Sequence, residues 1–425
     1  MGPDTRDRPR PARLRPERRR RGDVVAAAVL TVLLLGGAAV LWSTGDVAGT
    51  SADPAAEPIA APPAAAGVPT AVTEVWRAPS GATATPVVAG PAVVTAGGSR
   101  VVGRHAATGQ EHWSYARDRP LCTVAAGFPR ADDGLGRVLA LYEGGSGYCS
   151  ELTSLRPDTG ARAGAGNPDV HPGTRLLASG SSVVATGGDY LEVLRSDLVK
   201  TLEYGDVPAA AQPDEQPRPD CAHGSTAIGS DRLAVVERCP GEPADRLTVV
   251  APDGEDGAEK PQEEFSVPLP GPGAVVVAVS ADRVAVALPG PPRLLLFDSA
   301  GQQVGAHPLE IPDTEIADPP GGVAAVESDG ERFSWWTGSR TIALDGRDLT
   351  PVWAVPGTLG PAVAYGGGLL APVPDGLLVL DPGTGASLRT IPVQRPDGPV
   401  RLASLGEVLL EQRGDEVVAL RPAPA

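Results

Sequence analysis

The chain has 425 residues, including 53 glycines and 46 prolines, and its formal net charge is −16. A chain of this length is too long for one small domain but can form one large β architecture with additional segments. Nine of the 36 basic residues but only four of the 52 acidic residues lie in residues 1–23, so the remainder is more acidic still. A body of that charge repels phosphate backbones, which argues against nucleic-acid binding.

The N-terminal segment predicts one membrane-spanning helix. Residues 24–42 contain no charge and no proline, and as a helix they would rise about 28 Å, close to the ~30 Å hydrocarbon core of a bilayer. The arginines before it predict, by the positive-inside rule, a cytoplasmic tail at 1–23, a signal-anchor helix at 24–42 and an exported remainder. The alternatives are a cleavable signal peptide for the helix, and binding of anionic lipid or a cytoplasmic partner for the arginines.

Residues 43–72 are rich in alanine and proline and lack hydrophobic periodicity. This composition predicts a disordered, extended linker with nothing to bury. At ~3.1 Å per residue such a tether would hold the following domain roughly several tens of ångströms from the membrane.

Residues 73–425 repeat a pattern of short apolar strands and Gly/Asp turns roughly every 35–50 residues. Consecutive apolar residues, as in Val275 to Val279 and Leu294 to Phe297, are typical of strands buried on both faces. The repeat predicts an all-β fold, a β-propeller of about eight four-stranded blades, with seven blades as the alternative because the third unit is short. The units are 84–115, 122–165, 174–203, 221–267, 274–308, 320–354, 361–392 and 397–422.

The two ends of the repeat region predict how the ring closes. The last unit stops after three strands, whereas residues 73–78 form a strand with no unit before it. Pairing the two would complete one blade from both ends of the chain and hide the exposed edges.

Several units carry a turn-and-tryptophan motif. In GRHAATGQEHW, residues 103–113, Thr108 and Gly109 form a turn that is followed by Trp113. In ALDGRDLTPVW, residues 343–353, Asp345 and Trp353 keep the same separation without Thr-Gly. Residues 154–164 and 377–389 keep Thr-Gly and lose the tryptophan. We interpret the glycines as turn residues and Trp113 and Trp353 as packing between blades, with ligand stacking as the alternative.

On these motifs the chain resembles the PQQ-like, or quinoprotein-type, β-propeller family, although His105 stands where the family has aspartate. Some family members are dehydrogenases that hold pyrroloquinoline quinone and Ca²⁺ beside an adjacent Cys-Cys pair, which this sequence lacks. Others are non-enzymatic scaffolds in outer-membrane assembly, or membrane-tethered proteins of high-GC Gram-positive bacteria. The basic tail, anchor helix and Ala/Pro linker are most similar to the last group.

The four cysteines predict two disulfides on the exported side. In an antiparallel hairpin the start of the first strand lies beside the end of the second. Cys122 and Cys149 are centred on the turn 131–136, and Cys221 and Cys239 on the turn 229–232, so we expect these two pairs. Redox or metal chemistry of the cysteines is the alternative.

The remaining polar residues do not predict a catalytic site. The five histidines lack zinc-site spacing, and Ser146 in GGSGY lacks the strand-to-helix turn of a nucleophile elbow. Acidic loops at 213–220 and 253–264 are predicted to be solvated, with weak Ca²⁺ binding as the alternative, and are where we expect partner contacts.

The sequence therefore favours a membrane-tethered extracytoplasmic propeller that binds a protein or cell-envelope ligand without catalysis or cofactor. A PQQ-dependent quinoprotein oxidoreductase is the alternative. A sensor that signals through the helix is a third reading, with only about 23 residues inside the cell.

Overall fold

The computed structural model describes residues 21–44, 48–129, 131, 133–208, 210–212, 214–229 and 231–424. Helix α1 (Arg21–Thr44) contains the predicted segment 24–42 and extends beyond it at both ends. By length and composition α1 is long and apolar enough to cross a membrane. Most of the predicted basic tail, residues 1–20, lies outside the described residues.

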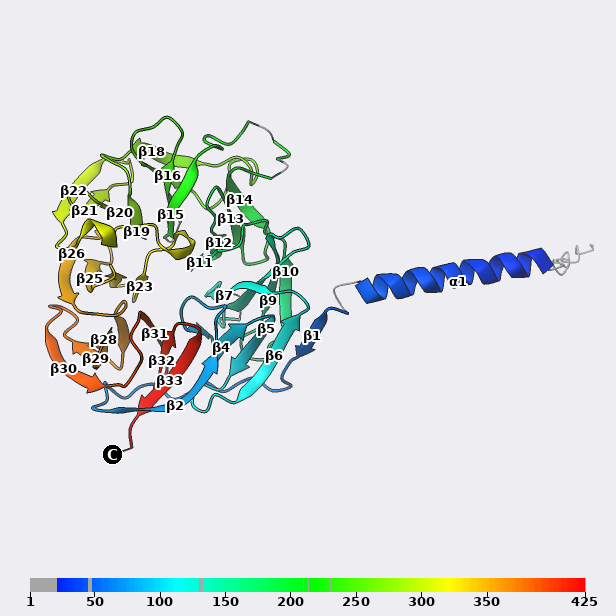
Figure 1. Cartoon of the computed structure of the whole chain (residues 1–425), viewed down its shortest axis with the longest axis horizontal. Coiled ribbons are helices and arrows are strands. Elements are labelled where there is room, and N and C mark those ends of the chain that lie inside the picture. The colour runs from blue at the N-terminus through cyan, green and yellow to red at the C-terminus, as the bar shows by residue number, and fades with distance from the viewer. Residues whose placement is uncertain are drawn as a thin grey trace, which may run out of the picture. The chain divides into compact units, whose positions relative to one another are not determined.

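In the described part of the chain the strands form eight sheets, which Figure 1 shows arranged in a ring. The prediction of eight four-stranded blades is confirmed, because each unit found in the sequence corresponds to one sheet in chain order.

The strands of blades 1 to 4 are β3–β6 (Val87–Ala89, Ala92–Gly97, Arg100–Arg104, Glu111–Arg117), β7–β10 (Leu121–Gly127, Arg137–Glu143, Cys149–Leu155, Arg162–Gly166), β11–β14 (Leu176–Ser179, Ser182–Ala185, Tyr190–Arg195, Lys200–Gly205) and β15–β18 (Ala222–Ile228, Leu233–Arg238, Arg246–Val250, Glu263–Pro268). Those of blades 5 to 8 are β19–β22 (Val275–Val279, Val284–Leu288, Arg293–Phe297, Gln303–Pro308), β23–β26 (Val326–Ser328, Arg332–Trp336, Arg340–Asp345, Pro351–Pro356), β27–β30 (Val363–Tyr365, Gly368–Val373, Gly376–Leu380, Ser387–Pro392) and β31–β33 (Val400–Leu405, Val408–Arg413, Glu416–Pro422) with β2 (Val72–Pro79).

The apolar runs of the sequence become strands buried on both faces. All five residues of β19 and all five of β20 are buried. One core cluster joins blade 4 to blade 5, with Val236 and Val249 on one side and Val276 and Val286 on the other. Burial between neighbouring blades is the main force that holds the ring together.

The ring closes as predicted, since β2 pairs antiparallel with β33 from Val72↔Pro422 to Pro79↔Glu416. Blade 8 therefore combines the strand that follows the N-terminal segments with the last three strands, and the C-terminus lies beside β2 (Figure 1). Closure covers the edges that an open eight-sheet array would expose.

The predicted linker differs from expectation, because residues 50–71, which we call the clasp, pack against the propeller. Strand β1 (Thr50–Asp53) adds a fifth strand to blade 1 beside β6. Ile59 is 4% exposed, and its backbone N–H donates to Asp158 O in blade 2 at 2.9 Å. The prediction of a tether with nothing to bury is therefore wrong for the clasp.

The clasp crosses the seam at which the ring closes. From blade 2 it continues to blade 8, where Glu407 N donates to Pro63 O at 2.8 Å, and to blade 7, where Arg389 donates to Val68 O at 2.9 Å. These partners stabilise the clasp backbone, so its proline-rich composition did not prevent order. Asp158 lies in the turn between the third and fourth strands of blade 2, and Glu407 in the turn between the first and second strands of blade 8. The clasp therefore contacts the end of the blades at which these turns lie.

Candidate functional site

The labelled first strands, among them β7, β15 and β23, lie towards the middle of the ring (Figure 1), and one connecting segment reaches across that middle. The channel segment, residues 309–325 between β22 and β23, contains the 3₁₀ turns η1 (Asp313–Glu315) and η2 (Pro320–Gly322). It leaves blade 5 and enters blade 6, yet it contacts blades 3 and 4. Asp318 receives two hydrogen bonds of 2.6 Å from Arg238 of blade 4, and Thr186 of blade 3 donates to Gly321 O at 2.8 Å.

Close packing holds the channel segment in place. Leu309, Ile311 and Ile316 are buried against blades 5 and 6. The Glu315 carboxylate accepts hydrogen bonds from Thr337 at 2.5 Å and Ser339 at 3.0 Å. Gly321 has φ 68°, and a Cβ there would lie 2.5 Å from Arg175 Cγ, so this close approach to blade 3 requires glycine.

Between the channel segment and blades 6 and 8 lies a cavity of about 500 Å³, which we call the channel pocket. This volume falls within the range of small-molecule sites. Val275, Val323 and Trp335 contribute apolar surface, and Trp336, Arg401 and Gln412 contribute aromatic and polar surface. The pocket is bordered by the turns between second and third strands and by the connections from one blade to the next. These turns and connections lie at one end of the blades, and the turns that the clasp contacts at Asp158 and Glu407 lie at the opposite end.

Arg401 is the principal charge of the channel pocket. Its guanidinium lies over the Trp336 ring, 5.6 Å from the centroid, and Trp336 Nε1 donates to Thr358 O at 3.0 Å. Within the residues that the structure describes, no carboxylate lies within ion-pair distance of Arg401. Burial lowers the pKa of Arg401, although guanidinium groups remain charged at neutral pH. Burial also raises the pKa of the neighbouring Glu327 on β23 to about 7, against the opposing effect of Arg401.

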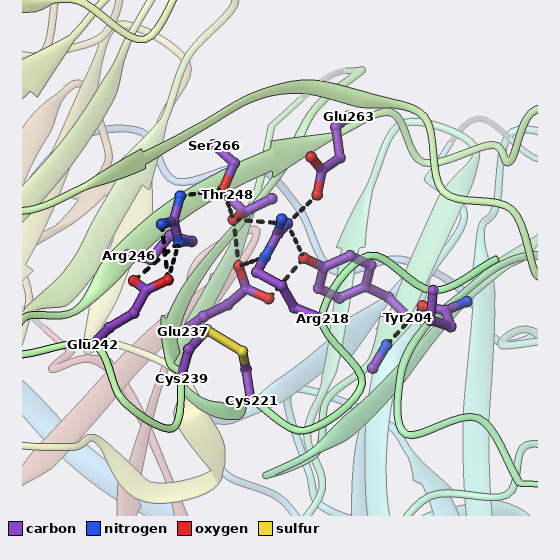
Figure 2. A network of polar contacts seen from close by, with 12 residues as sticks. Tyr204, Arg218, Cys221, Glu237, Cys239, Glu242, Arg246, Thr248, Glu263 and Ser266 are labelled. Atoms are coloured by element: carbon purple, nitrogen blue, oxygen red, sulfur yellow. Dashed lines mark hydrogen bonds and ion pairs between the residues drawn. A yellow bond between two sulfur atoms is a disulfide. The ribbon is translucent and has the colours of Figure 1, made fainter. Parts of the chain in front are cut away.

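A second polar cluster joins blades 3 and 4 (Figure 2). Glu237 on β16 is fully buried and accepts hydrogen bonds from Tyr204 Oη at 2.7 Å and Arg218 Nε at 3.0 Å. Thr248 donates to the same carboxylate, and Arg218 also reaches Glu263 (Figure 2). All of these groups are paired with one another, so we assign the cluster to structure: it anchors the 206–220 loop to blade 4.

The two acidic loops, predicted to be solvated and to contact partners, bind each other. Glu259 of the second loop accepts hydrogen bonds from the backbone N–H groups of Ala211 and Gln212 at 3.0 and 2.6 Å. Gln216 of the first donates to Glu259 O at 2.8 Å. The loops therefore form one acidic projection beside blades 3 and 4, and partner binding there stays a prediction.

Blade 3 contains a buried glutamate that predicts a pH-dependent stability. Glu192 is fully buried, receives hydrogen bonds from Tyr190 at 2.9 Å and pairs with Lys200 at 3.0 Å. Burial raises its pKa to about 7, with Lys200 acting in the opposite direction. Because the folded pKa exceeds the unfolded one, this group's contribution to stability is present below pH 4.5 and is lost as pH rises toward 7.

In the wild type, ionisation of Glu192 is expected to lower the free energy of unfolding by about 2 kcal/mol between pH 5 and pH 8, at roughly 1.4 kcal/mol per pKa unit. Glu192→Gln is expected to abolish this part of the pH dependence, because glutamine does not ionise. Urea unfolding of both proteins at the two pH values measures the effect. The same pH dependence in the variant and the wild type would contradict it.

The motif residues lie at the interfaces between blades. Trp113 is 1% exposed, its Nε1 donates to Pro157 O at 2.8 Å, and its ring covers Gly160 of blade 2. A Cβ on Gly160, whose φ is 72°, would lie 2.6 Å from that ring. Each such tryptophan therefore packs on the Thr-Gly turn of the next blade.

Other motif residues follow the same arrangement. Gly109 lies under Trp76 of the closing strand, and Thr108 Oγ1 accepts a hydrogen bond from Gln110 N at 3.3 Å. Trp353 is half-buried over Gly385 and donates to Pro382 O at 3.1 Å. Asp345 caps its own turn by accepting a hydrogen bond from Arg347 N at 2.8 Å.

Where the tryptophan is missing, the partner turn changes as well. Blade 2 has Gly164 on its outer strand, and Leu198 takes the turn position of blade 3 with φ 63°. A Cβ on Gly164 would lie 3.4 Å from Leu198 Cδ1. From its position in the turn, Leu198 therefore approaches the region that a tryptophan side chain would occupy. The leucine compensates for the missing tryptophan, and no consensus motif in the sequence marks this replacement.

Both predicted disulfides are confirmed. Cys122 pairs with Cys149 in blade 2 and Cys221 with Cys239 in blade 4. Figure 2 shows the second beside Glu237. Cys221 and Cys239 flank the β15–β16 hairpin, as the hairpin argument predicted. Cys122 lies on β7, but Cys149 lies on β9, the third strand of the blade, so the geometry predicted for this bond is wrong although the pairing is right.

The pocket residues were not found in the sequence. Trp336 and Arg401 belong to no motif. The units found in the sequence split the channel segment, with its first part in the connection after the 274–308 unit and its last part at the start of the 320–354 unit. Its Pro-Pro-Gly-Gly run at 319–322 is the one available signal, since it interrupts the strand pattern. Ser146 lies in the turn between β8 and β9, and no group of His, Cys, Asp and Glu suited to a metal ion occurs among the described residues.

No protein-family model matches the chain, and no curated protein does. Among solved structures, BamB from Moraxella catarrhalis matches with 14% identity and a TM-score of 0.50 over 82% of this chain and 99% of BamB. The computationally designed Ika8 protein matches with 12% identity and a TM-score of 0.47, over 86% of this chain and 100% of its own. BBS1N, solved in complex with ARL6DN, has 11% identity and a TM-score of 0.43, over 84% of this chain and 99% of its own. At these identities the shared property is the fold alone: the chain is an eight-bladed β-propeller, similar in fold to BamB.

Proposed function

We propose that this protein is a non-catalytic binding or scaffold module, held outside the cell membrane by its N-terminal helix, which recognises a protein, cell-envelope or small polar ligand. The observation that carries the proposal is the channel pocket, in which the channel segment and several blades place Arg401 beside apolar surface, with no carboxylate of the described residues within ion-pair distance. A rigid ring that presents one such pocket is suited to recognition.

The proposed topology rests on the N-terminal segments and the disulfides. Arginine-rich residues 1–23 precede an apolar helix, and this charge distribution favours a cytoplasmic N-terminus. The two disulfides suit an oxidising compartment on the other side of the membrane. The resemblance to membrane-tethered PQQ-like proteins agrees with this arrangement.

The quinoprotein alternative fits the channel pocket poorly. Pyrroloquinoline quinone is a polycarboxylate, whereas the pocket contains one arginine without a carboxylate partner and also the carboxylates of Glu315 and Asp318. Asp318 is already paired with Arg238. Addition of the quinone with Ca²⁺ is therefore expected to give neither cofactor absorbance in the purified protein nor a thermal shift. Stoichiometric uptake would contradict the proposal.

Site-specific photo-crosslinking in native membranes tests the binding role. A benzophenone amino acid at exposed Thr314 or Ala317, beside the channel pocket, is expected to give a defined adduct with the ligand. Matched controls are Val304 and Leu388, which are 50% and 63% exposed on outer strands. Adducts confined to the controls, or absent at all four positions, would contradict the proposal.

A further inference from the structure

The channel pocket contains a positive charge that the fold does not use. Several other buried or half-buried arginines of the propeller have carboxylate partners: Arg395 with Glu411 at 2.6 Å, Arg218 with Glu237 at 3.0 Å, and Arg238 with Asp318 at 2.6 Å. Arg401, in contrast, has an aromatic ring on one side and the pocket on the other. Among the described residues no carboxylate lies within ion-pair distance of this half-buried guanidinium, and Glu327 acts on it only from farther away, so a bound anion would stabilise it.

The walls of the pocket restrict what that partner can be. Glu315 has hydroxyl partners, Thr337 and Ser339, rather than a cation, so its negative charge remains in the pocket wall. A ligand with several negative charges would be repelled by Glu315, whereas a single carboxylate can be held by one arginine through two hydrogen bonds. The apolar lining, formed by Val275, Val323 and Trp335, favours a hydrophobic remainder.

We propose that the channel pocket binds a small organic monocarboxylate, whose carboxylate pairs with the guanidinium of Arg401 and whose apolar body packs against Trp335 and Trp336. The proposal rests on the binding function proposed above and specifies the class of its ligand. The cavity of about 500 Å³ accommodates a molecule of this kind.

Glu327 on β23 is the carboxylate of blade 6 that interacts electrostatically with Arg401, and it decides the pH of the test. Burial raises its pKa to about 7, so at pH 6 it is mostly neutral and does not compete with a bound carboxylate for Arg401. A carboxylic acid ligand of ordinary acidity is still ionised at pH 6.

The test uses the full-length protein in lipid nanodiscs, labelled with 5-fluorotryptophan, at pH 6. The chain has six tryptophans, and the fluorine resonance of Trp336 is assigned with Trp336→Phe. Benzoate is the probe and benzamide its neutral control. Benzoate is expected to shift the Trp336 resonance saturably in the millimolar range, and benzamide to bind at least tenfold more weakly.

Two variants make the result specific. Arg401→Gln is expected to weaken benzoate binding at least tenfold, which corresponds to about 1.4 kcal/mol. Arg162→Gln, at an exposed position on β10, is expected to leave it unchanged. Equal binding of benzoate and benzamide, unchanged binding in Arg401→Gln, or no saturable shift would overturn the carboxylate proposal. Crosslinked adducts at Thr314 or Ala317 would in that case still support the binding function, so the two failures are distinguishable.

Discussion

Replacing Trp113 with alanine is expected to lower the free energy of unfolding by about 3–5 kcal/mol. The ring is 1% exposed, covers Gly160 of blade 2 and donates a hydrogen bond of 2.8 Å to Pro157 O. Its removal leaves a cavity between blades 1 and 2 and an unsatisfied carbonyl. Urea unfolding followed by circular dichroism measures the effect.

Trp353→Ala is the matched control for this prediction. Trp353 makes the same type of contact, over Gly385 and with Pro382 O, but its side chain is only half-buried. We therefore expect roughly half of the loss seen for Trp113→Ala, because less apolar surface is removed. A loss below 1 kcal/mol for Trp113→Ala would contradict its role in joining blades.

Replacing Arg395 with alanine is expected to cost about 3–5 kcal/mol. The Arg395 and Glu411 side chains are 1% and 0% exposed, and their ion pair measures 2.6 Å. Arg395 lies between β30 and β31 and also donates to Gly376 O at 2.8 Å, so it connects blade 7 to blade 8. Its loss leaves the buried Glu411 carboxylate with Arg413 as its remaining cation.

Two variants serve as comparisons for Arg395→Ala in the same unfolding measurement. Arg100→Ala breaks an exposed pair, Arg100 with Glu111, whose side chains are 47% and 44% exposed, and is expected to cost less than 1 kcal/mol. The double variant Arg395→Leu, Glu411→Leu is expected to recover part of the loss, since no unpaired buried charge remains. Similar small losses of unfolding free energy for Arg395→Ala and Arg100→Ala would contradict the prediction that breaking a buried ion pair costs more stability than breaking an exposed one.

The sequence predicted those features that depend on local patterns. Short apolar strands and Gly/Asp turns define each blade and recur roughly every 35–50 residues. The hairpin argument predicted both cysteine pairs, and its geometry holds for Cys221 and Cys239, which flank the β15–β16 hairpin. Cys149 pairs with Cys122 as predicted, but it lies on β9, the third strand of blade 2, and not at the end of the predicted hairpin. Closure followed from an incomplete last unit, since an unpaired strand at each end requires a partner.

The clasp shows why composition alone was misleading. Proline and alanine offer little side-chain surface to bury, which argued for disorder. Its backbone groups nevertheless find partners on blades 2, 7 and 8, such as Asp158 O and Glu407 N, and these exist only once the ring has formed.

By itself the sequence determined the repeat and the cysteine pairs, because these depend on segments close together in the chain, and the closing strand, because both ends of the repeat region carry incomplete units. It left eight and seven blades open, and the eight sheets of the structure decided between them. Only the tertiary structure decided the channel pocket. Thr186 and Gly321, which hold the channel segment across the ring, are 135 residues apart, and Trp336 and Arg401 come from different blades. The channel segment is a coil without hydrophobic periodicity, and it packs against residues that come together only when the ring closes. Its position therefore leaves no local pattern in the sequence.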